Sequence, residues 1–169
     1  MDPLEQLKRR IEATLFHKRN IENVGISIMS MRDAMFSYTI GASRSGLPDI
    51  IGTNIPPATA LYTFNVLFNY WKYNGFQDGR IPGLFESKDA EKDMAIYVKL
   101  VDYDDHLIDR YVTQAHNFYL ENPEYVHPKH GIRFVQVLYP DENGRTQFEP
   151  GFNMQYHQIL VEQAITRMQ

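Results

Sequence analysis

The sequence predicts an α+β protein: a mainly antiparallel or mixed sheet packed by about four helices, in a single domain over residues 1–169. Residues 24–28 and 35–40 alternate apolar and polar side chains across a short turn, which predicts an antiparallel hairpin. Strand-like segments at 94–101 and 132–139 are separated by a segment with helical spacing. The chain length and a 43% hydrophobic content are typical of one globular domain.

The first helix is expected over residues 1–20, from Pro3 to about Arg19. Pro3 suits the first turn of a helix, where no hydrogen bond is lost. The apolar side chains recur at helical spacing: Leu4, Leu7, Ile11 and Leu15. The other side is basic: Lys8, Arg9, Arg10, Lys18 and Arg19. A solvated helix face explains these charges more simply than contact with nucleic acid or an acidic partner.

A second helix is expected from Pro56 and Pro57 to about Asn74, after a short strand at 49–52. It is apolar nearly all round, which is typical of a helix buried between a sheet and another element or subunit. Residues 76–92 hold glycines, prolines and a charged run, which predict a loop.

Helical spacing recurs in two later segments. A third helix is expected from Asp104 or Asp105 to Asn122, because an aspartate favours a helix start and Asn122-Pro123 favours an end. A C-terminal helix is expected over residues 155–169.

Composition narrows the function classes. The chain has no cysteine, which excludes disulfides, thiolate nucleophiles and Cys-ligated zinc. A net charge of -4 makes nucleic acid an unlikely partner. The apolar run from Ile55 to Trp71 contains prolines and asparagines, so no membrane contact is expected. The N-terminus lacks the pattern of a signal peptide, which favours a soluble cytoplasmic protein.

The familiar catalytic and nucleotide-binding motifs do not occur. We find no P-loop, dinucleotide fingerprint, nucleophile elbow or zinc-protease helix in the sequence. We therefore expect no cofactor and no metal.

The loop from Gly41 to Gly46 is the best candidate for binding a small ligand. A Gly-Ser loop exposes backbone N–H groups, and the Arg44 guanidinium could hold an anion. The simpler interpretation is a strand connection whose glycines satisfy turn geometry.

Histidines and aspartates offer an alternative chemistry. His127 and His130 lie close together in the sequence, and Asp104, Asp105 and His106 form a second group. A His and a carboxylate within reach of each other could form an acid/base pair or part of a metal site. A solvated loop and a helix start explain these residues more simply.

Residues 141–145 form a third candidate. Their acids could suggest a metal, but Asn143-Gly144 after a strand predicts a hairpin turn. Arg145, just beyond that turn, stays a candidate for an ion pair or a ligand contact.

Two separated blocks resemble the domain of unknown function 4262 family. The resemblance extends over about residues 24–152 and implies an uncharacterised bacterial or phage protein with no assigned activity. The matching residues of the first block are Phe36, Tyr38, Thr39, Gly41, Gly46, Pro48 and Asp49. Those of the second block are Tyr139, Pro140, Asp141, Gly144, Arg145, Phe148, Pro150 and Gly151.

We expect a binding module that acts through a Tyr/Arg-lined surface on a small ligand, which could be anionic, or on a protein, including a second copy in a homo-oligomer. The alternative is a hydrolase or transferase using His106, His127 or His130 with Asp104 or Asp105. The candidate binding residues, expected to converge from both blocks, are Tyr38, Thr39, Arg44, Asp49, Tyr139 and Arg145.

Overall fold

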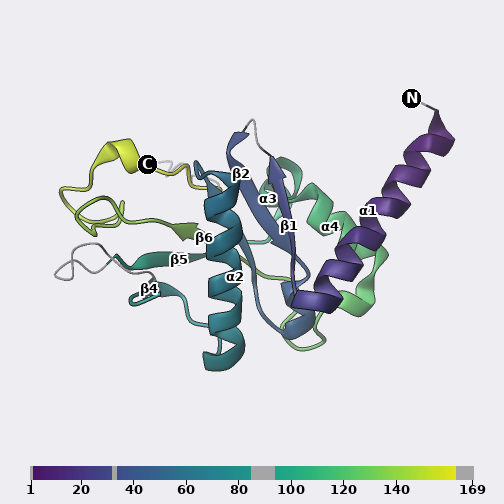
Figure 1. Cartoon of the computed structure of the whole chain (residues 1–169), viewed down its shortest axis with the longest axis horizontal. Coiled ribbons are helices and arrows are strands. Elements are labelled where there is room, and N and C mark those ends of the chain that lie inside the picture. Colours follow the sequence, from purple (N-terminus) through teal and green to yellow (C-terminus); the bar gives the residue numbers. More distant parts are fainter. Residues whose placement is uncertain (1, 32–33, 85–93, 163–169) are drawn as a thin grey trace, which may run out of the picture.

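The computed structural model describes residues 2–31, 34–84 and 94–162. These residues form six strands and four α-helices (Figure 1). The strands are β1 (Ser27–Met31), β2 (Phe36–Ile40), β3 (Asp49–Thr53), β4 (Gly79–Ile81), β5 (Ile96–Val101) and β6 (Phe134–Leu138). The helices are α1 (Pro3–Val24), α2 (Pro57–Asn74), α3 (Asp105–Arg110) and α4 (Thr113–Glu121).

All six strands belong to one sheet, in the order β1-β2-β3-β6-β5-β4. Neighbouring strands are antiparallel except for the central pair, β3 and β6, which run parallel with Asp49 opposite Phe134. This arrangement confirms the predicted α+β fold with a mixed sheet. It also places the start of β3 beside the start of β6, where the candidate site lies.

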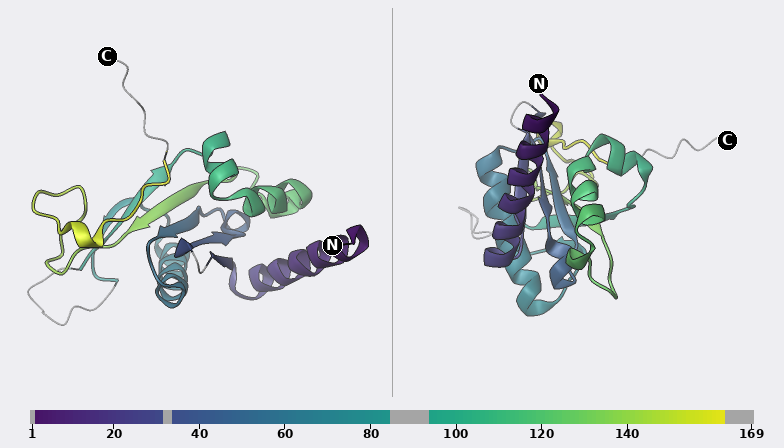
Figure 2. Two further views of the ribbon diagram at one scale, coloured as in Figure 1. Left: turned by 90° about the horizontal axis from the view of Figure 1, so that it is seen from above. Right: turned by 90° about the vertical axis from the view of Figure 1, so that its right-hand side faces the viewer.

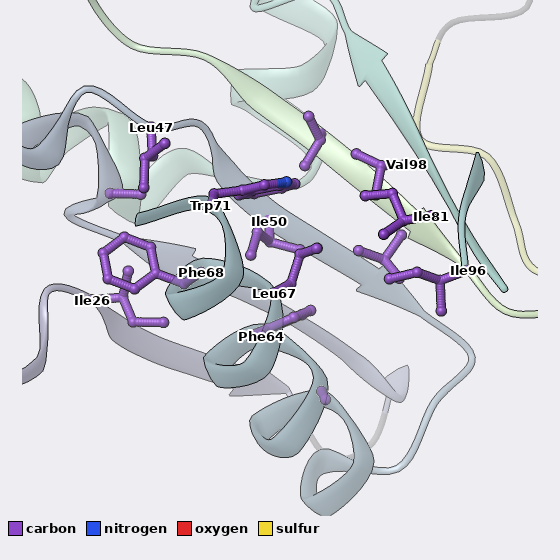
Figure 3. Packing of buried hydrophobic residues seen from close by; sticks show 14 of the residues in the cluster. Ile26, Leu47, Ile50, Phe64, Leu67, Phe68, Trp71, Ile81, Ile96 and Val98 are labelled. Atoms are coloured by element: carbon purple, nitrogen blue, oxygen red, sulfur yellow. The ribbon is translucent and has the colours of Figure 1, made fainter. Parts of the chain in front are cut away.

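Helices cover both faces of the sheet (Figure 2). One core lies under α2, where Phe64, Leu67 and Trp71 pack on Ile50 and Val98 (Figure 3). A second core lies between the opposite face and α3 with α4. Strands β2, β3 and β6 are buried along their whole length because they lie between these two layers. No helix in the described part of the chain is long and apolar enough to cross a membrane.

Helix α2 begins and ends as the sequence predicts, but only one of its sides is covered. Leu61 and Tyr62 on the other side are 51% and 61% exposed. The second covering layer that its composition suggested is therefore not supplied by the described residues.

Helix α1 is longer than predicted. Asp2 accepts a hydrogen bond from the Leu4 N–H at its start, and the helix ends at Gly25, whose N–H donates to the Ile21 carbonyl. Gly25 has φ +95, a left-handed conformation that glycine adopts cheaply. The helix therefore continues past Arg19 to Val24, and β1 begins at Ser27 rather than at Val24.

The predicted third helix is divided into α3 and α4. The Asp104 carboxylate accepts from the Leu107 N–H and starts α3, as predicted. The Thr113 hydroxyl donates to the Ile108 carbonyl at 2.7 Å and satisfies the C-terminal end of α3. Such a side-chain bond competes with the helical backbone ladder, so the chain turns at Tyr111 and Val112 and starts α4.

Strand β4 lies in a segment predicted to be a loop. Gly79–Ile81 pairs with β5 over three residues, too short for a periodic signal. The charged run that follows in the sequence, residues 86–93, lies outside the described residues.

The predicted helix over 155–169 is wrong in its described part. Only Met154–Tyr156 forms a short 3-10 helix, and residues 157–162 have no regular structure. Gln136 and Gln158 explain this difference. The Gln136 amide donates to the Ile159 carbonyl and accepts from the Val161 N–H, while Gln158 donates to the Thr53 carbonyl. Side chains thus take the place of helical hydrogen bonds, and residues 163–169 lie outside the described part.

The predicted hairpin at Asn143-Gly144 is a turn without a second strand. The Gly144 N–H donates to the Asp141 carbonyl, and the Asp141 N–H donates to the Arg145 carbonyl. Hydrogen bonds to the side chain of Asp141, rather than pairing with a second strand, hold this segment in place. The Asp141 carboxylate accepts from the backbone N–H groups of Asn143, Arg145 and Asn153.

Candidate functional site

The loop between β2 and β3 is built on two left-handed glycines. Gly41 has φ +103 and Gly46 has φ +73, on either side of a single 3-10 turn at Ala42–Ser45. A side chain at Gly41 would meet Ile21, because an ideal Cβ there lies 2.3 Å from Ile21 Cγ1. The glycines therefore serve turn geometry and close packing, as the simpler interpretation predicts.

A buried carboxylate holds this loop from inside the domain. Asp49 Oδ1 accepts from the Thr39 hydroxyl at 2.7 Å and from the Ala42 N–H at 3.1 Å. Asp49 Oδ2 accepts from the Tyr119 hydroxyl at 2.5 Å. The Tyr119 oxygen in turn accepts from the Gly41 N–H at 2.8 Å. The loop is thus tied to β3 and to α4 through one acid and one phenol.

Burial controls the ionisation of this network. Asp49 is fully buried, and burial raises the pKa of its carboxyl to about 7, against the lowering effect of the bonds from Tyr119, Thr39 and Ala42. Burial, followed by the charge of Asp49, raises the pKa of Tyr119 well above its ordinary value. Burial likewise raises the pKa of Tyr103 to about 12. Asp49 therefore exists in both protonation states near neutral pH, surrounded by protonated phenols.

Tyr38 lies on the same side of the sheet as this network. Burial raises the pKa of its hydroxyl to about 12, and the charge of Asp49 contributes to the rise. Tyr103, another neighbour of Asp49, forms a short hydrogen bond with His116 Nδ1 of α4. The aromatic hydroxyls around Asp49 thus belong to a buried polar cluster inside the second core.

A cavity of about 600 Å³ lies on the outer side of the same loop. Its walls come from the last turn of α2, the end of the loop and the residues before β6. The described residues that line it are Ser45, Gly46, Leu47, Trp71, Lys72, Gly75, Phe76, His130 and Arg133. Lys72, His130 and Arg133 carry or can carry positive charge, and none of the described lining residues is acidic.

Arg133 contacts two walls of this cavity, the end of the Gly41–Gly46 loop and the segment after α2. Its guanidinium donates to the Gly46 carbonyl at 2.7 Å and lies 5.3 Å from the centre of the Phe76 ring. Phe76 in turn packs edge-on against Trp71, with 5.0 Å between ring centres. The Arg133 Nε–H is buried and has no hydrogen-bond partner among the described residues. A donor of this kind is costly to leave unsatisfied.

His127 and His130 fix the segment that precedes Arg133. Their rings stack with 4.9 Å between centres, and His127 Nδ1 accepts from the His130 N–H at 3.1 Å. The His127 N–H donates to the Ser43 hydroxyl, which donates to the Gly131 carbonyl. Burial, followed by the charge of Arg133, lowers the pKa of His130. This imidazole is therefore biased toward its neutral form.

The six candidate binding residues form two groups. Tyr38, Thr39 and Asp49 lie together in the buried cluster, and Arg44 lies exposed on the loop above them, 5.2 Å from the Tyr125 ring centre. Tyr139 and Arg145 follow the opposite end of β6. The structure does not bring the two groups around one cavity.

The second group has its own structural contacts. The Tyr139 hydroxyl bonds Thr63 of α2, and burial raises its pKa to about 12. Arg145 Nη1 donates to the Gly151 carbonyl at 3.1 Å, within the turn that Asp141 organises. These two residues hold the segment after β6 on the domain.

The pair needed for acid/base catalysis does not form in the described part of the chain. The Asp104 carboxylate caps α3, and His106 packs on Tyr111 with 6.2 Å between ring centres. Neither His127 nor His130 has a hydrogen bond or ion pair with Asp104 or Asp105. Within the described ranges, no three His, Asp or Glu side chains are grouped so as to hold a metal ion.

Sequence reasoning missed most of the cavity. The sequence places Trp71 and Lys72 in a helix, Phe76 at the start of a loop, Arg133 in a strand and Tyr119 on the apolar face of a helix, and none of these patterns indicates a shared cavity. No sequence signal distinguished these residues, because a cation in the last turn of a helix, as at Lys72, is common through its favourable interaction with the helix dipole.

Together these features define an α+β domain in which a buried carboxylate supports a surface loop beside a basic cavity. Residues 20–153 match the family model described as Domain of unknown function (DUF4262). The match covers most of the chain, so the chain belongs to this family, as the two motif blocks indicated. Searches of curated proteins and of solved structures give no match.

Proposed function

We propose that this protein binds a small anionic ligand in the cavity beside the Gly41–Gly46 loop. The observation that carries the proposal is the charge of the lining: Lys72, His130 and Arg133 with no described acid, in a chain whose net charge is -4. Basic groups in a concave, partly apolar site concentrate anions and strengthen hydrogen bonds to them.

The Arg133 guanidinium supports the same proposal, since it lines the cavity and can donate hydrogen bonds to an anion. Trp71 and Phe76 add flat aromatic walls, which suit a ligand with an apolar or planar part. In this scheme Asp49 and Tyr119 are positioning residues. They fix the loop that forms one wall, and they do not line the cavity.

The single tryptophan of the chain offers a direct test, because Trp71 lines the cavity. We expect saturable changes in tryptophan fluorescence on titration with inorganic phosphate, pyrophosphate or succinate. Lys72→Gln should weaken binding by about tenfold or more, because a hydrogen bond to a charged group is worth ~1.5–3 kcal/mol.

Arg110→Gln is the matched control, since it removes one positive charge from an exposed position on α3, across the sheet from the cavity. Equal losses in K72Q and R110Q would show that only net charge matters and would contradict the site. A flat titration with all three anions up to about 10 mM, a Kd weaker than ordinary specific binding, would also contradict it.

Anion affinity should also depend on pH through His130. A bound anion favours the imidazolium, whereas burial and the charge of Arg133 lower the pKa of His130. Binding of an anion whose own charge is constant over this range, such as sulfate, therefore takes up a proton, and its affinity should rise as pH falls from about 8 to 5.5, where histidine titrates. Isothermal titration in two buffers of different ionisation enthalpy measures this uptake. His130→Gln should abolish the uptake, and unchanged uptake in that variant would assign it to another group.

A further inference from the structure

Helix α1 carries an apolar stripe that the domain leaves uncovered. Leu4, Leu7, Ile11 and Leu15 recur every three or four residues, so they share one face. Their exposed fractions are 72%, 50%, 52% and 54%. Four adjacent large apolar side chains on one helix face form a contiguous patch, which is unusual on a monomer surface. We call these four residues the α1 stripe.

The rest of the domain holds α1 by a different side. His17 and Ile21 are its only buried residues among those described, and both lie in its C-terminal half. Arg10 pairs with Glu121 at 2.7 Å and Lys18 with Glu124 at 3.8 Å, both at the surface. The N-terminal turns extend past the end of the sheet (Figures 1 and 2).

An unpacked helix end needs a further stabilising contact. Helices gain most of their stability from packing an apolar face, and short isolated ones are marginal in water. The family match begins at residue 20, so the whole α1 stripe lies outside it. The stripe is therefore a feature added to the family domain, independent of the cavity.

We propose that the α1 stripe pairs with the same stripe of a second copy of this chain, with the two helices antiparallel. The stripe is nearly symmetric about its own middle, as a two-fold interface requires. An antiparallel alignment places Leu4 against the partner's Leu15 and Leu7 against the partner's Ile11. Each apolar side chain then meets another.

The charges beside the stripe favour this orientation. Lys8 and Glu12 lie along its edge, and neither forms an ion pair with any described residue. In the antiparallel alignment Lys8 faces the partner's Glu12, and symmetry repeats the contact. In a parallel pair the edge that carries Lys8 and Glu12 would face the opposite edge of the partner helix, so the Lys8–Glu12 contacts could not form.

Sedimentation velocity of the full chain tests the proposal. We expect a monomer–dimer equilibrium over roughly 5–300 µM chain, because an interface this small binds weakly. Ile11→Glu should raise the dimer dissociation constant by about tenfold or more. Leu61→Glu is the matched control, since Leu61 is exposed to the same extent on α2. A monomer throughout this range, or a dimer that only L61E disrupts, would overturn the proposal.

Charge exchange tests the partner contacts. Lys8→Glu and Glu12→Lys should each weaken the dimer, and the double variant K8E/E12K should restore it. Circular dichroism of each variant checks that α1 remains helical. A double variant as weak as the two single ones would exclude the Lys8–Glu12 contact and overturn the antiparallel model.

Cross-linking tests the orientation directly, because the natural chain has no cysteine. The variant L4C/L15C should form disulfide-linked dimers under mild oxidation, whereas L4C alone should not. A disulfide within one chain is excluded, since Cα atoms 11 positions apart on a helix lie about 16 Å from each other. Cross-linking of L4C alone would show a parallel pair and overturn the proposed arrangement.

Discussion

The variant Asp49→Asn is expected to lose most of a pH dependence of stability that the native protein shows between about pH 4 and pH 7. An unfolded aspartate titrates near its ordinary pKa, whereas burial raises the pKa of Asp49 to about 7 in the folded domain. The folded chain therefore binds the extra proton between these two values. This proton stabilises the folded chain fully at pH values below the pKa of Asp49 in the unfolded chain. The stabilisation is lost as pH rises through the pKa of Asp49 in the folded domain.

The difference between these two pKa values corresponds to a change of about 4 kcal/mol, as an upper limit, in the free energy of unfolding. Urea unfolding at a series of pH values gives the measurement. The free energy of unfolding of the native protein, minus that of D49N, should fall between pH 4 and pH 7 and then level off. A difference that rises with pH would mean that Asp49 is stabilised as a carboxylate, and the account of the buried network would be wrong.

Asp141→Asn provides a control of opposite sign. Burial alone would raise the pKa of Asp141, but hydrogen bonds from the N–H groups of Asn153, Arg145 and Asn143 lower it overall. Asp141 therefore stabilises the folded chain at pH values above its pKa in the unfolded chain. This stabilisation is lost as pH falls through the pKa of Asp141 in the folded domain. The difference between native protein and D141N should rise with pH, in the acid range below about pH 4.

The variant Gly41→Ala should be the most destabilising small substitution in the candidate site. The left-handed backbone at Gly41 costs a side chain about 1–2 kcal/mol. The added Cβ would also lie 2.3 Å from Ile21 Cγ1, and overpacking of this kind costs about 1–3 kcal/mol. We expect the free energy of unfolding to fall by about 2–5 kcal/mol, measured by urea or thermal unfolding.

Two further variants separate the cost of the left-handed backbone from the cost of the steric clash with Ile21. Gly79 has φ +81, and a Cβ added there would have no described heavy atom within 4 Å, so Gly79→Ala should show the backbone cost alone. Ile21→Ala removes the atoms that a Cβ at Gly41 would meet, so G41A should cost less in that background than in the native chain. Additive effects of I21A and G41A would show that the close approach to Ile21 does not contribute.

Local patterns were sufficient to predict the elements that form from neighbouring residues. Alternation over residues 35–40 and helical spacing from Pro56 and Pro57 to about Asn74 predicted elements within about one residue of the observed bounds. The same spacing failed at Tyr111, where the Thr113 side chain interrupts the backbone ladder. It failed again after Tyr156, where Gln136 and Gln158 replace helical hydrogen bonds. Both failures arise from side-chain contacts that periodicity does not encode.

The candidate site was only half predictable. The motif residues Thr39, Gly41 and Asp49 pointed to the loop, since glycine and aspartate are costly or specialised in a strand connection. The cavity beside it combines Lys72 with Arg133, which meet only because β3 pairs with β6. Without that long-range pairing, Arg133 is an ordinary residue before a strand.

The parallel pairing of β3 with β6 has a consequence for how the chain folds. Strands β1, β2 and β3 are consecutive and antiparallel, so they can associate through short loops. The pairing of Asp49 with Phe134 instead closes a very long loop of chain. The chain entropy lost on closing this loop must be overcome before the contacts between the two strands can stabilise it. We therefore expect the edge of β3 that pairs with β6 to remain unpaired until late in folding. The cavity, whose walls come from both sides of that seam, is assembled last.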